Sequence, residues 1–329
     1  MTRAVRFSVV PERPYSLALT AERYTRYPEV VDRFDGRTYR RLLPMGRGGV
    51  LLSVEQEGPA ARAVLRVGLE GAAARSTAAG EAARRVVERA LGAATAVSPF
   101  YRAHRADEVL AAPIRAFRGL RGAGVPSLWE GLVTAVLAQQ VNLQFAYDIR
   151  RELSLAYGRR ARFSGETYVA FPSPEPFAAE SLPRLRRFRL SRSKAVAIRE
   201  IARAFASGAL SEEILAPLSD EEAIGRLTAL HGVGRWTAEI GLLRGLGRTD
   251  IFPAGDLGVV KYLAQGLLGH PTRAKEDAMR RFAERWAPHR GLALVYGYAE
   301  LNRRRASLSR PAPRPSSPPG PGSARSRGR

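Results

Sequence analysis

A glycine hairpin and a single aspartate are the residues in this chain whose types and spacing suggest joint chemistry. The hairpin, His231–Arg235, lies between apolar helix patterns predicted over Asp220–Leu230 and Trp236–Leu246, and Asp256 follows in a Phe-Pro-Ala-Gly-Asp turn. Glycines let a phosphate approach the backbone closely, and the free N–H groups that start the second helix form an anion site. The hairpin therefore predicts phosphate binding. Asp256 is predicted either to cap the following helix or to act on a bound nucleotide.

The charge of the chain favours a polyanionic partner. Its 53 Lys and Arg outnumber 31 Asp and Glu, which gives a formal net charge of +22. Basic residues that neutralise phosphates gain affinity from counterion release. Only three of the basic residues are Lys (Lys194, Lys261 and Lys275), so a coding bias toward Arg is an alternative source of the charge.

The absence of cysteine removes several classes of site. Without Cys the chain cannot form disulfides, zinc-thiolate sites, iron–sulfur clusters or thiol nucleophiles. No apolar run reaches the length of a membrane span, and residues 1–14 lack the apolar core of a secretory signal. We therefore expect a cytoplasmic protein that does not interact with membranes.

The elements that must position the hairpin and the aspartate divide into two parts with a tail. Apolar residues recur at every second position in 5–9 and 63–69, residues 50–54 form a short apolar run, and three- and four-residue steps in 83–91 indicate a helix. Residues 1–98 are thus predicted to form a mixed α/β domain, without a catalytic constellation, that serves a structural or docking role. Helical patterns then fill 99–305. Residues 306–329, rich in Pro, Ser, Gly and Arg, are predicted to be disordered.

Two adjacent amides close an apolar helix in the helical part. A capping box, Ser127 to Glu130, starts this helix, and Gln139 and Gln140 follow its last apolar residues. They are either a polar helix terminus or DNA-contacting residues, since amides can hydrogen-bond base edges. A second capping box, Ser219 to Glu222, starts the first helix of the hairpin.

These patterns together resemble a known family. The run Leu-x-x-Leu-x-Gly-Val-Gly-Arg-Trp-Thr-Ala at residues 227–238 closely matches the helix-hairpin-helix motif. Asp256 follows this motif, and three further runs match the same family: Leu-Ala-Gln-Gln-Val, Ser-Arg-Ser-Lys-Ala and Glu-Arg-Trp-x-Pro-x-Arg. Residues 99–305 therefore resemble the helix-hairpin-helix/Gly-Pro-Asp superfamily of DNA glycosylases. The nearest subfamily is bacterial 3-methyladenine DNA glycosylase II, whose N-terminal domain is TATA-binding-protein-like. The resemblance implies an α+β fold, with such a domain before an all-α glycosylase domain.

The resemblance also implies a reaction and its site. Asp256 would stabilise an oxocarbenium-like transition state at C1′ of a flipped nucleotide, as in base excision repair of alkylated DNA. The pocket aromatics would be Trp236, Tyr298 and, less directly, Trp129. For each of these aromatic residues, packing in the hydrophobic core is the alternative to a role in the base pocket. The residues implied in DNA binding are Gln139, Gln140, Gly232, Val233, Gly234, Arg235 and Thr237. The carbonyls of Thr228, Leu230 and Val233 would hold a monovalent cation, Na⁺ or K⁺, and no other cofactor is expected.

One substitution narrows the expected reaction. Superfamily members that also cleave the strand carry a Lys where this chain has Trp236, and Trp offers no amine nucleophile. We therefore expect a monofunctional enzyme that leaves an abasic site. Its expected substrate is double-stranded DNA of the nucleoid, and the protein is expected to be a monomer. Three departures leave the base preference open: Glu239-Ile240 stand where an aromatic is common, Gln140 replaces an apolar wedge, and His289 replaces a Trp. A glycosylase for oxidised or deaminated bases, or a non-catalytic DNA-binding protein, are the alternatives.

Overall fold

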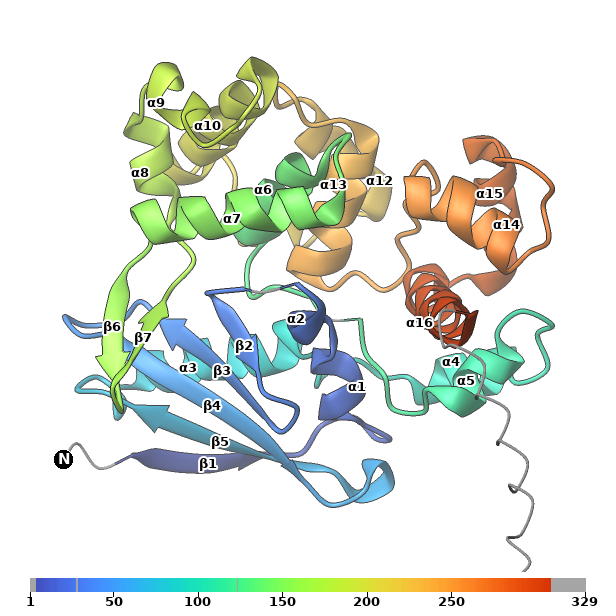
Figure 1. Ribbon diagram of the computed structural model, residues 1–329, viewed down its shortest axis with the longest axis horizontal. Coiled ribbons are helices and arrows are strands. Elements are labelled where there is room, and N and C mark those ends of the chain that lie inside the picture. The colour runs from blue at the N-terminus through green and yellow to red at the C-terminus, as the bar shows by residue number, and fades with distance from the viewer. Residues whose placement is uncertain (1–3, 28, 123, 309–329) are drawn as a thin grey trace, which may run out of the picture.

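The N-terminal part is an antiparallel sheet backed by short helices. The computed structural model describes residues 4–27, 29–122 and 124–308. Its strands are β1 Val5–Val9, β2 Asp32–Phe34, β3 Thr38–Leu43, β4 Val50–Glu57 and β5 Val64–Glu70, in the order β1-β5-β4-β3-β2 (Figure 1). The alternating residues of β5 are buried on one face because successive side chains of a strand point to opposite sides. The strands predicted at 5–9, 50–54 and 63–69 are confirmed, whereas β2 and β3 were not predicted.

Helices cover the buried face of this sheet. They are α1 Leu17–Ala21, α2 Arg23–Arg26, α3 Thr77–Arg85 and a π-helical turn Val86–Ala90. A short 3-10 helix, Ala60–Arg62, links β4 to β5 and has no buried residue. One core cluster joins β3, β4 and β5 to these helices. The helix predicted over 83–91 is therefore present, but it starts earlier and ends in a π-helical turn.

The remaining described chain is helical apart from one hairpin, β6 Arg160–Phe163 with β7 Glu166–Val169. The α-helices are α4 Ser98–His104, α5 Ala111–Ala116, α6 Leu128–Ala138, α7 Leu143–Tyr157, α8 Pro174–Ala179, α9 Leu182–Arg186, α10 Arg192–Ala206, α11 Glu212–Leu215, α12 Asp220–Thr228, α13 Arg235–Gly241, α14 Ala264–Gly266, α15 Glu276–Ala283 and α16 Arg290–Leu308. The π-helical turns are Leu242–Leu246 and Gly258–Leu263, and Glu284–Trp286 is a 3-10 helix. The α+β class is confirmed, and α4 starts at the predicted domain boundary.

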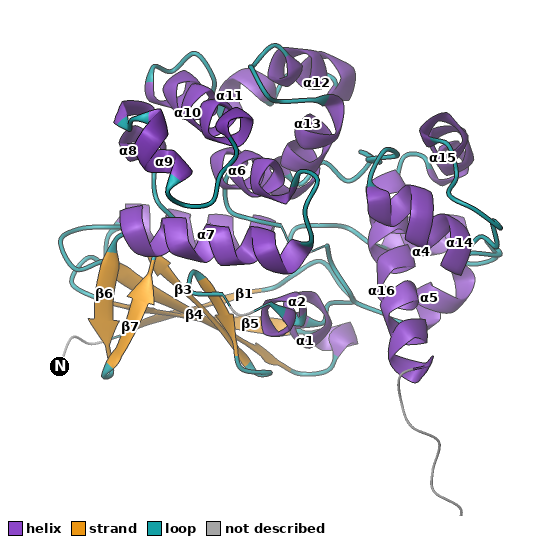
Figure 2. Cartoon of the chain, turned by 45° about the horizontal axis from the view of Figure 1, so that its top comes forward, coloured by secondary structure: helices purple, strands orange, loops and turns teal. Residues whose placement is uncertain are grey.

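These helices form two groups with separate cores. α6 to α13 pack around one hydrophobic cluster above the sheet, and α7 runs between that cluster and the sheet (Figures 1 and 2). A second cluster, at the right of Figure 1, joins α4 and α5 to helices that come much later in the chain. These are α15, α16 and the segment 252–264. The hairpin belongs to the first group and Asp256 to the second, so the fold brings the two together where the groups meet.

A buried ion network fastens the sheet to the first helical group. Arg41 of β3 donates to Asp32 at 2.7 Å and to Glu130 of α6 at 2.5 Å, and Arg150 of α7 pairs with Glu130 and Glu29. Burial alone would raise the pKa of Asp32, but Arg41 and Arg150 lower it below its usual range. Buried charges are retained where partners and hydrogen bonds offset the cost of desolvation. The second half of the capping box predicted at Ser127 is therefore wrong: Ser127 caps α6, but the Glu130 side chain joins this network.

The last described helix, α16, runs into the predicted tail. α16 extends to Leu308, so the predicted tail begins inside it, and the rest of that tail lies outside the described residues. None of the described helices combines the length and apolar composition needed to cross a bilayer.

Candidate active site

Asp256 lies at the start of the π-helical turn Gly258–Leu263 and acts as its cap. Its Oδ1 accepts a hydrogen bond from the Gly258 N–H at 2.7 Å, and its carbonyl accepts from Val259 and Val260 at 2.9 Å. The sequence left capping and chemistry as alternatives. The structure shows the capping geometry directly, and it leaves the carboxylate half-buried rather than enclosed.

Two aromatic side chains from distant segments hold the same carboxylate. The indole N–H of Trp236, in α13, donates to Oδ2 at 2.7 Å, and the Tyr298 hydroxyl, in α16, donates to Oδ1 at 2.8 Å. Burial and the neighbouring Asp256 carboxylate raise the pKa of Tyr298 well above its usual range, so the phenol stays a neutral donor. The two rings predicted for the pocket thus fix the rotamer of Asp256.

Gly258 makes room for this arrangement. A Cβ at that position would lie 2.3 Å from the Tyr298 hydroxyl and 2.8 Å from Oδ1 of Asp256. Both distances are below any real carbon contact. Glycine is therefore required at position 258, two residues after Asp256, so that the Tyr298 hydroxyl can reach the carboxylate.

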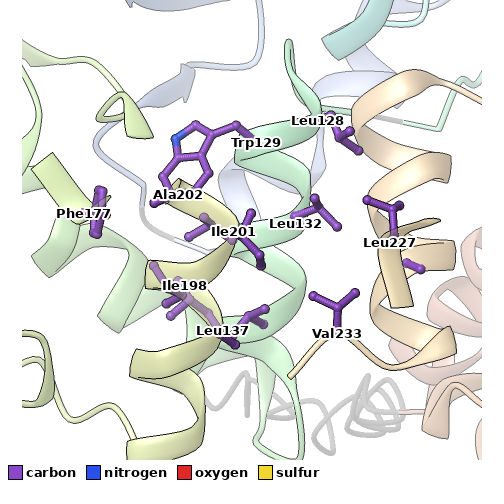
Figure 3. Packing of buried hydrophobic residues seen from close by; sticks show 14 of the residues in the cluster. Leu128, Trp129, Leu132, Leu137, Phe177, Ile198, Ile201, Ala202, Leu227 and Val233 are labelled. Atoms are coloured by element: carbon purple, nitrogen blue, oxygen red, sulfur yellow. The ribbon is translucent and has the colours of Figure 1, made fainter. Parts of the chain in front are cut away.

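The hairpin joins α12 to α13 and rests on α10. Gly232 has φ of +79°, and a Cβ there would lie 2.5 Å from the Cβ of Ala197, so glycine is needed on two counts. Val233 is buried and points into the first cluster (Figure 3). Gly234 caps α13 with an ordinary φ of −84°, and a Cβ there would meet nothing within 4 Å. Its open side is where the backbone is free for an approaching phosphate.

The predicted amides have different surroundings. The Gln139 side chain donates to the Gly232 carbonyl at 3.1 Å and to the Thr237 hydroxyl at 2.9 Å, so it braces the hairpin from α6. Thr237 is only 2% exposed, so its side chain is not available to DNA. Gln140 is exposed and has φ of +54°, a conformation that non-glycine residues adopt at a cost, typically at functional sites.

Arg235 is committed to acidic partners. Its guanidinium pairs with Glu221 at 2.5 Å and with the buried Glu239 at 3.0 Å, and Arg280 of α15 binds the same Glu239 at 2.9 Å. The guanidinium is thus occupied by two carboxylates, and the predicted role of Arg235 in DNA binding stays a prediction. Glu239, a departure from the family pattern, links the hairpin helix to α15.

Trp129 is a core residue, which corrects its assignment to the base pocket. It is 5% exposed, its N–H donates to the Pro172 carbonyl at 2.8 Å, and its ring lies 5.6 Å from that of Phe177 (Figure 3). The apolar stripe of α6 carries it into the first cluster, as the packing alternative indicated.

The carbonyls proposed for a cation lie on the hairpin. Thr228 is the last residue of α12, and the Leu230 carbonyl accepts a hydrogen bond from the Val233 N–H at 3.1 Å. A carbonyl keeps a second lone pair after one such bond. The Na⁺ or K⁺ site therefore stays a prediction.

Sequence reasoning missed a group of residues near Asp256. Arg244, in the π-helical turn after α13, interacts electrostatically with Asp256, Tyr298, Tyr147 and Arg23. Of these residues Asp256 and Tyr298 were predicted, whereas Arg244, Tyr147 and Arg23 come from three separate elements and share no motif. Only the fold brings them together.

Comparison with known proteins identifies relatives. Residues 133–288 match the sequence profile described as HhH-GPD superfamily base excision DNA repair protein. The chain is 37% identical over 164 residues to a DNA-3-methyladenine glycosylase of Bacillus subtilis, covering 50% of this chain and 54% of that protein. It is 33% identical over 178 residues to DNA-3-methyladenine glycosylase 2 of Escherichia coli, covering 54% and 59%.

A solved structure is similar over nearly the whole chain. The 3-methyladenine DNA glycosylase from Archaeoglobus fulgidus superposes with a TM-score of 0.74 at 26% identity, covering 91% of this chain and 98% of that chain. The sequence matches, in contrast, span a little over half the length of the curated relatives.

Proposed function

We propose that this protein is a monofunctional DNA glycosylase that removes alkylated purines from double-stranded DNA. The match of residues 133–288 to the profile of the HhH-GPD superfamily of base excision DNA repair proteins supports this proposal. The observation that carries the proposal is the Asp256 carboxylate, held by Trp236 and Tyr298 on the helix start beyond the hairpin. The B. subtilis and E. coli relatives, named for 3-methyladenine, support the choice of base.

The Asp256 carboxylate keeps an acceptor site that can face the sugar of a bound nucleotide. An ionised carboxylate has about four lone-pair sites. Among the residues that the structure describes, Oδ1 accepts from Gly258 and Tyr298, and Oδ2 accepts from Trp236 alone. One site on Oδ2 is thus left to face C1′ of a flipped nucleotide or to orient a water molecule.

The reaction that follows is a hydrolysis. The C1′–N bond breaks with its electron pair leaving on the base, and a cationic methylated purine thereby departs as a neutral molecule. The Asp256 carboxylate stabilises the positive charge that develops at C1′. The water oxygen then bonds to C1′ and releases its proton to solvent, which leaves an abasic site.

The lysines are poorly placed for strand cleavage through a Schiff base. Trp236 stands where a nucleophilic amine would be needed, and the Lys194 amine donates to the Leu137 carbonyl at 2.8 Å. Lys261, in the turn Gly258–Leu263, and Lys275, just before α15, are exposed. We therefore expect base release without lyase activity.

DNA would reach Asp256 across the hairpin. The free N–H groups at the start of α13 and the open side of Gly234 suit a backbone phosphate. Gln140 is exposed and has a costly backbone conformation, and we expect it to fill the gap left by a flipped base. Because phosphate contacts carry such binding, duplex affinity should fall steeply as salt rises.

A panel of duplexes that each contain one damaged base tests the proposal. The wild type should convert the strand with 3-methyladenine or 7-methylguanine into an abasic product, which breaks only after heating in alkali. Breakage without alkali contradicts the monofunctional assignment. Release of none of the bases contradicts the glycosylase assignment and favours a non-catalytic DNA-binding protein.

A further inference from the structure

Two arginines from different helices share the buried carboxylate of Glu239. The residue lies in α13, three positions after Trp236, and is 2% exposed. Its Oε1 accepts from Arg235 of the same helix at 3.0 Å and from Arg280 of α15 at 2.9 Å. A buried carboxylate is stable only where such partners offset the cost of its desolvation. The pair with Arg280 therefore ties the hairpin helix to α15.

The contacts continue from Arg280 to the turn that carries Asp256. The second guanidinium nitrogen of Arg280 donates to Glu276 at 2.8 Å. The Glu276 carboxylate lies against Gly255, the residue before Asp256, where a Cβ would be 2.6 Å from Oε2. The segment that enters α15 also donates a backbone hydrogen bond to the Val260 carbonyl at 2.8 Å. α15 is thus fixed to the same turn that Asp256 caps.

The hydrogen bond between Trp236 and Asp256 crosses from one helical group to the other. Trp236 follows the hairpin in the first group and Asp256 belongs to the second, so the 2.7 Å bond between them depends on how the groups meet. Glu239 and Arg280 both line a small cleft at this junction. A catalytic group must be held within about 0.5 Å of its working position, and a shift of about 1 Å can cost about a hundredfold in rate. The junction therefore needs a fixed geometry.

We propose that Glu239 and Arg280 are positioning residues for base release: their ion pair sets the position of Trp236 relative to the Asp256 carboxylate. This inference rests on the proposed glycosylase function and adds two residues to the same site. Both act through the Trp236 hydrogen bond rather than by contact with the sugar or the base. An arginine suits this role because its planar fork reaches Glu239 and Glu276 with separate nitrogens.

The Trp236 indole N–H reports on this geometry without any need for catalysis. Its resonance depends on the hydrogen bond to Asp256, whereas the Trp129 indole N–H donates to a carbonyl in the first core and serves as an internal reference. In protein with isotope-labelled tryptophan, Arg280→Met should shift the Trp236 indole signal, identified by its loss in Trp236→Phe, and leave the Trp129 signal in place. A Trp236 signal that does not move overturns the inference.

Single-turnover base release from a 7-methylguanine duplex, with enzyme in excess, measures the consequence for the reaction. Arg280→Met should release the base at least about tenfold more slowly, while its dissociation constant for the duplex changes less than about threefold because the hairpin backbone is untouched. Arg281→Met removes the same charge from the next, exposed position of α15 and should change neither value. Arg280→Lys keeps the charge but cannot span both carboxylates, so its release should stay at least about threefold slower than that of the wild type.

A second substitution tests whether the contacts act as one route. Glu276→Gln interrupts the route at its next member, so adding it to Arg280→Met should slow release no further. A further loss of the size seen in Glu276→Gln alone overturns the single route.

The remaining outcomes separate positioning from its alternatives. Full recovery in Arg280→Lys, or an equal loss of rate and duplex affinity in Arg280→Met, assigns Arg280 to its charge and overturns the inference. A lower thermal midpoint with unchanged release assigns Arg280 to stability alone. If Arg280→Met does not fold, Arg280→Lys supplies the same comparison. A wild type that releases no damaged base refutes the proposed function, whereas the Trp236 signal still decides whether Arg280 positions the carboxylate's partner.

Discussion

Replacement of Glu130 by Gln should loosen the connection between the sheet and the helices. Glu130 is 2% exposed and receives hydrogen bonds from both Arg41 and Arg150. The substitution keeps the shape of the side chain but removes its charge, and it turns an NH₂ group toward one of the guanidiniums. One buried guanidinium then loses one of its carboxylate acceptors, although Arg41 keeps Asp32 and Arg150 keeps Glu29.

The expected cost follows from the burial of the network. Breaking a buried ion pair by removing one partner costs about 3–5 kcal/mol, because the other charge stays uncompensated. Because the entropy of unfolding is about 2.1 cal/mol/K per residue, each kcal/mol lowers the thermal midpoint of this 329-residue chain by roughly 1.5 °C. We therefore expect Glu130→Gln to lower the midpoint by about 4–8 °C.

A matched substitution on the neighbouring helix provides the control. Glu152 of α7 pairs with Arg189, and both side chains are more than 40% exposed. Because exposed pairs contribute about 0–1 kcal/mol, Glu152→Gln should change the midpoint by no more than a few degrees. Thermal and denaturant unfolding followed by circular dichroism measure both variants. Equal midpoints for the two would refute the view that this network fastens the sheet to α6 and α7.

Three further predictions concern the site and its support. Gly232→Ala should lower both stability and duplex affinity because of its positive φ and the contact with α10, whereas Gly234→Ala should lower affinity alone, as binding titrations and unfolding curves would show; equal effects on stability contradict the difference drawn between the two glycines. Trp236→Phe removes one charge-assisted hydrogen bond to the carboxylate and should slow base release about tenfold or more in single-turnover assays, and an unchanged rate would contradict its positioning role. Burial lowers the pKa of His104 below its usual 6.5, so neutral His104 stabilises the fold above about pH 6.5 and this contribution is lost as the pH falls below that value. His104→Phe should therefore flatten the decline of the thermal midpoint below pH 6.5. An unaltered slope would exclude His104 as the source of that decline.

The parts of the fold that rest on local signals were predictable. The hairpin, the capping Ser219–Glu222 pair and the Asp256 turn each lie within a few residues of sequence, so their spacing defines their geometry. Trp236 was predicted for the base pocket from the family resemblance; the structure shows its hydrogen bond to Asp256, and its role in the pocket stays a prediction. Tyr298 could be placed only by the family resemblance, since 42 residues separate it from the aspartate.

The parts that depend on long-range contacts were not predictable. Arg41 and Glu130 are 89 positions apart, and Glu29 and Arg150 are 121 apart, so no local pattern pairs them. Trp129 was misplaced because an aromatic on an apolar helix stripe fits a core and a pocket equally well. Arg244 was overlooked because a chain rich in Arg gives no local signal for the one that interacts with Asp256.

The dependence of base release on Asp256 tests the central claim most directly. Asp256→Asn keeps the size of the side chain and should bind a 7-methylguanine duplex with unchanged affinity. It should release the base at least about a hundredfold more slowly than the wild type in a single turnover. Asp277→Asn, the same change at an exposed position of α15, should match the wild type in both measurements. Base release by Asp256→Asn at the wild-type rate would contradict the assignment of the reaction to this carboxylate.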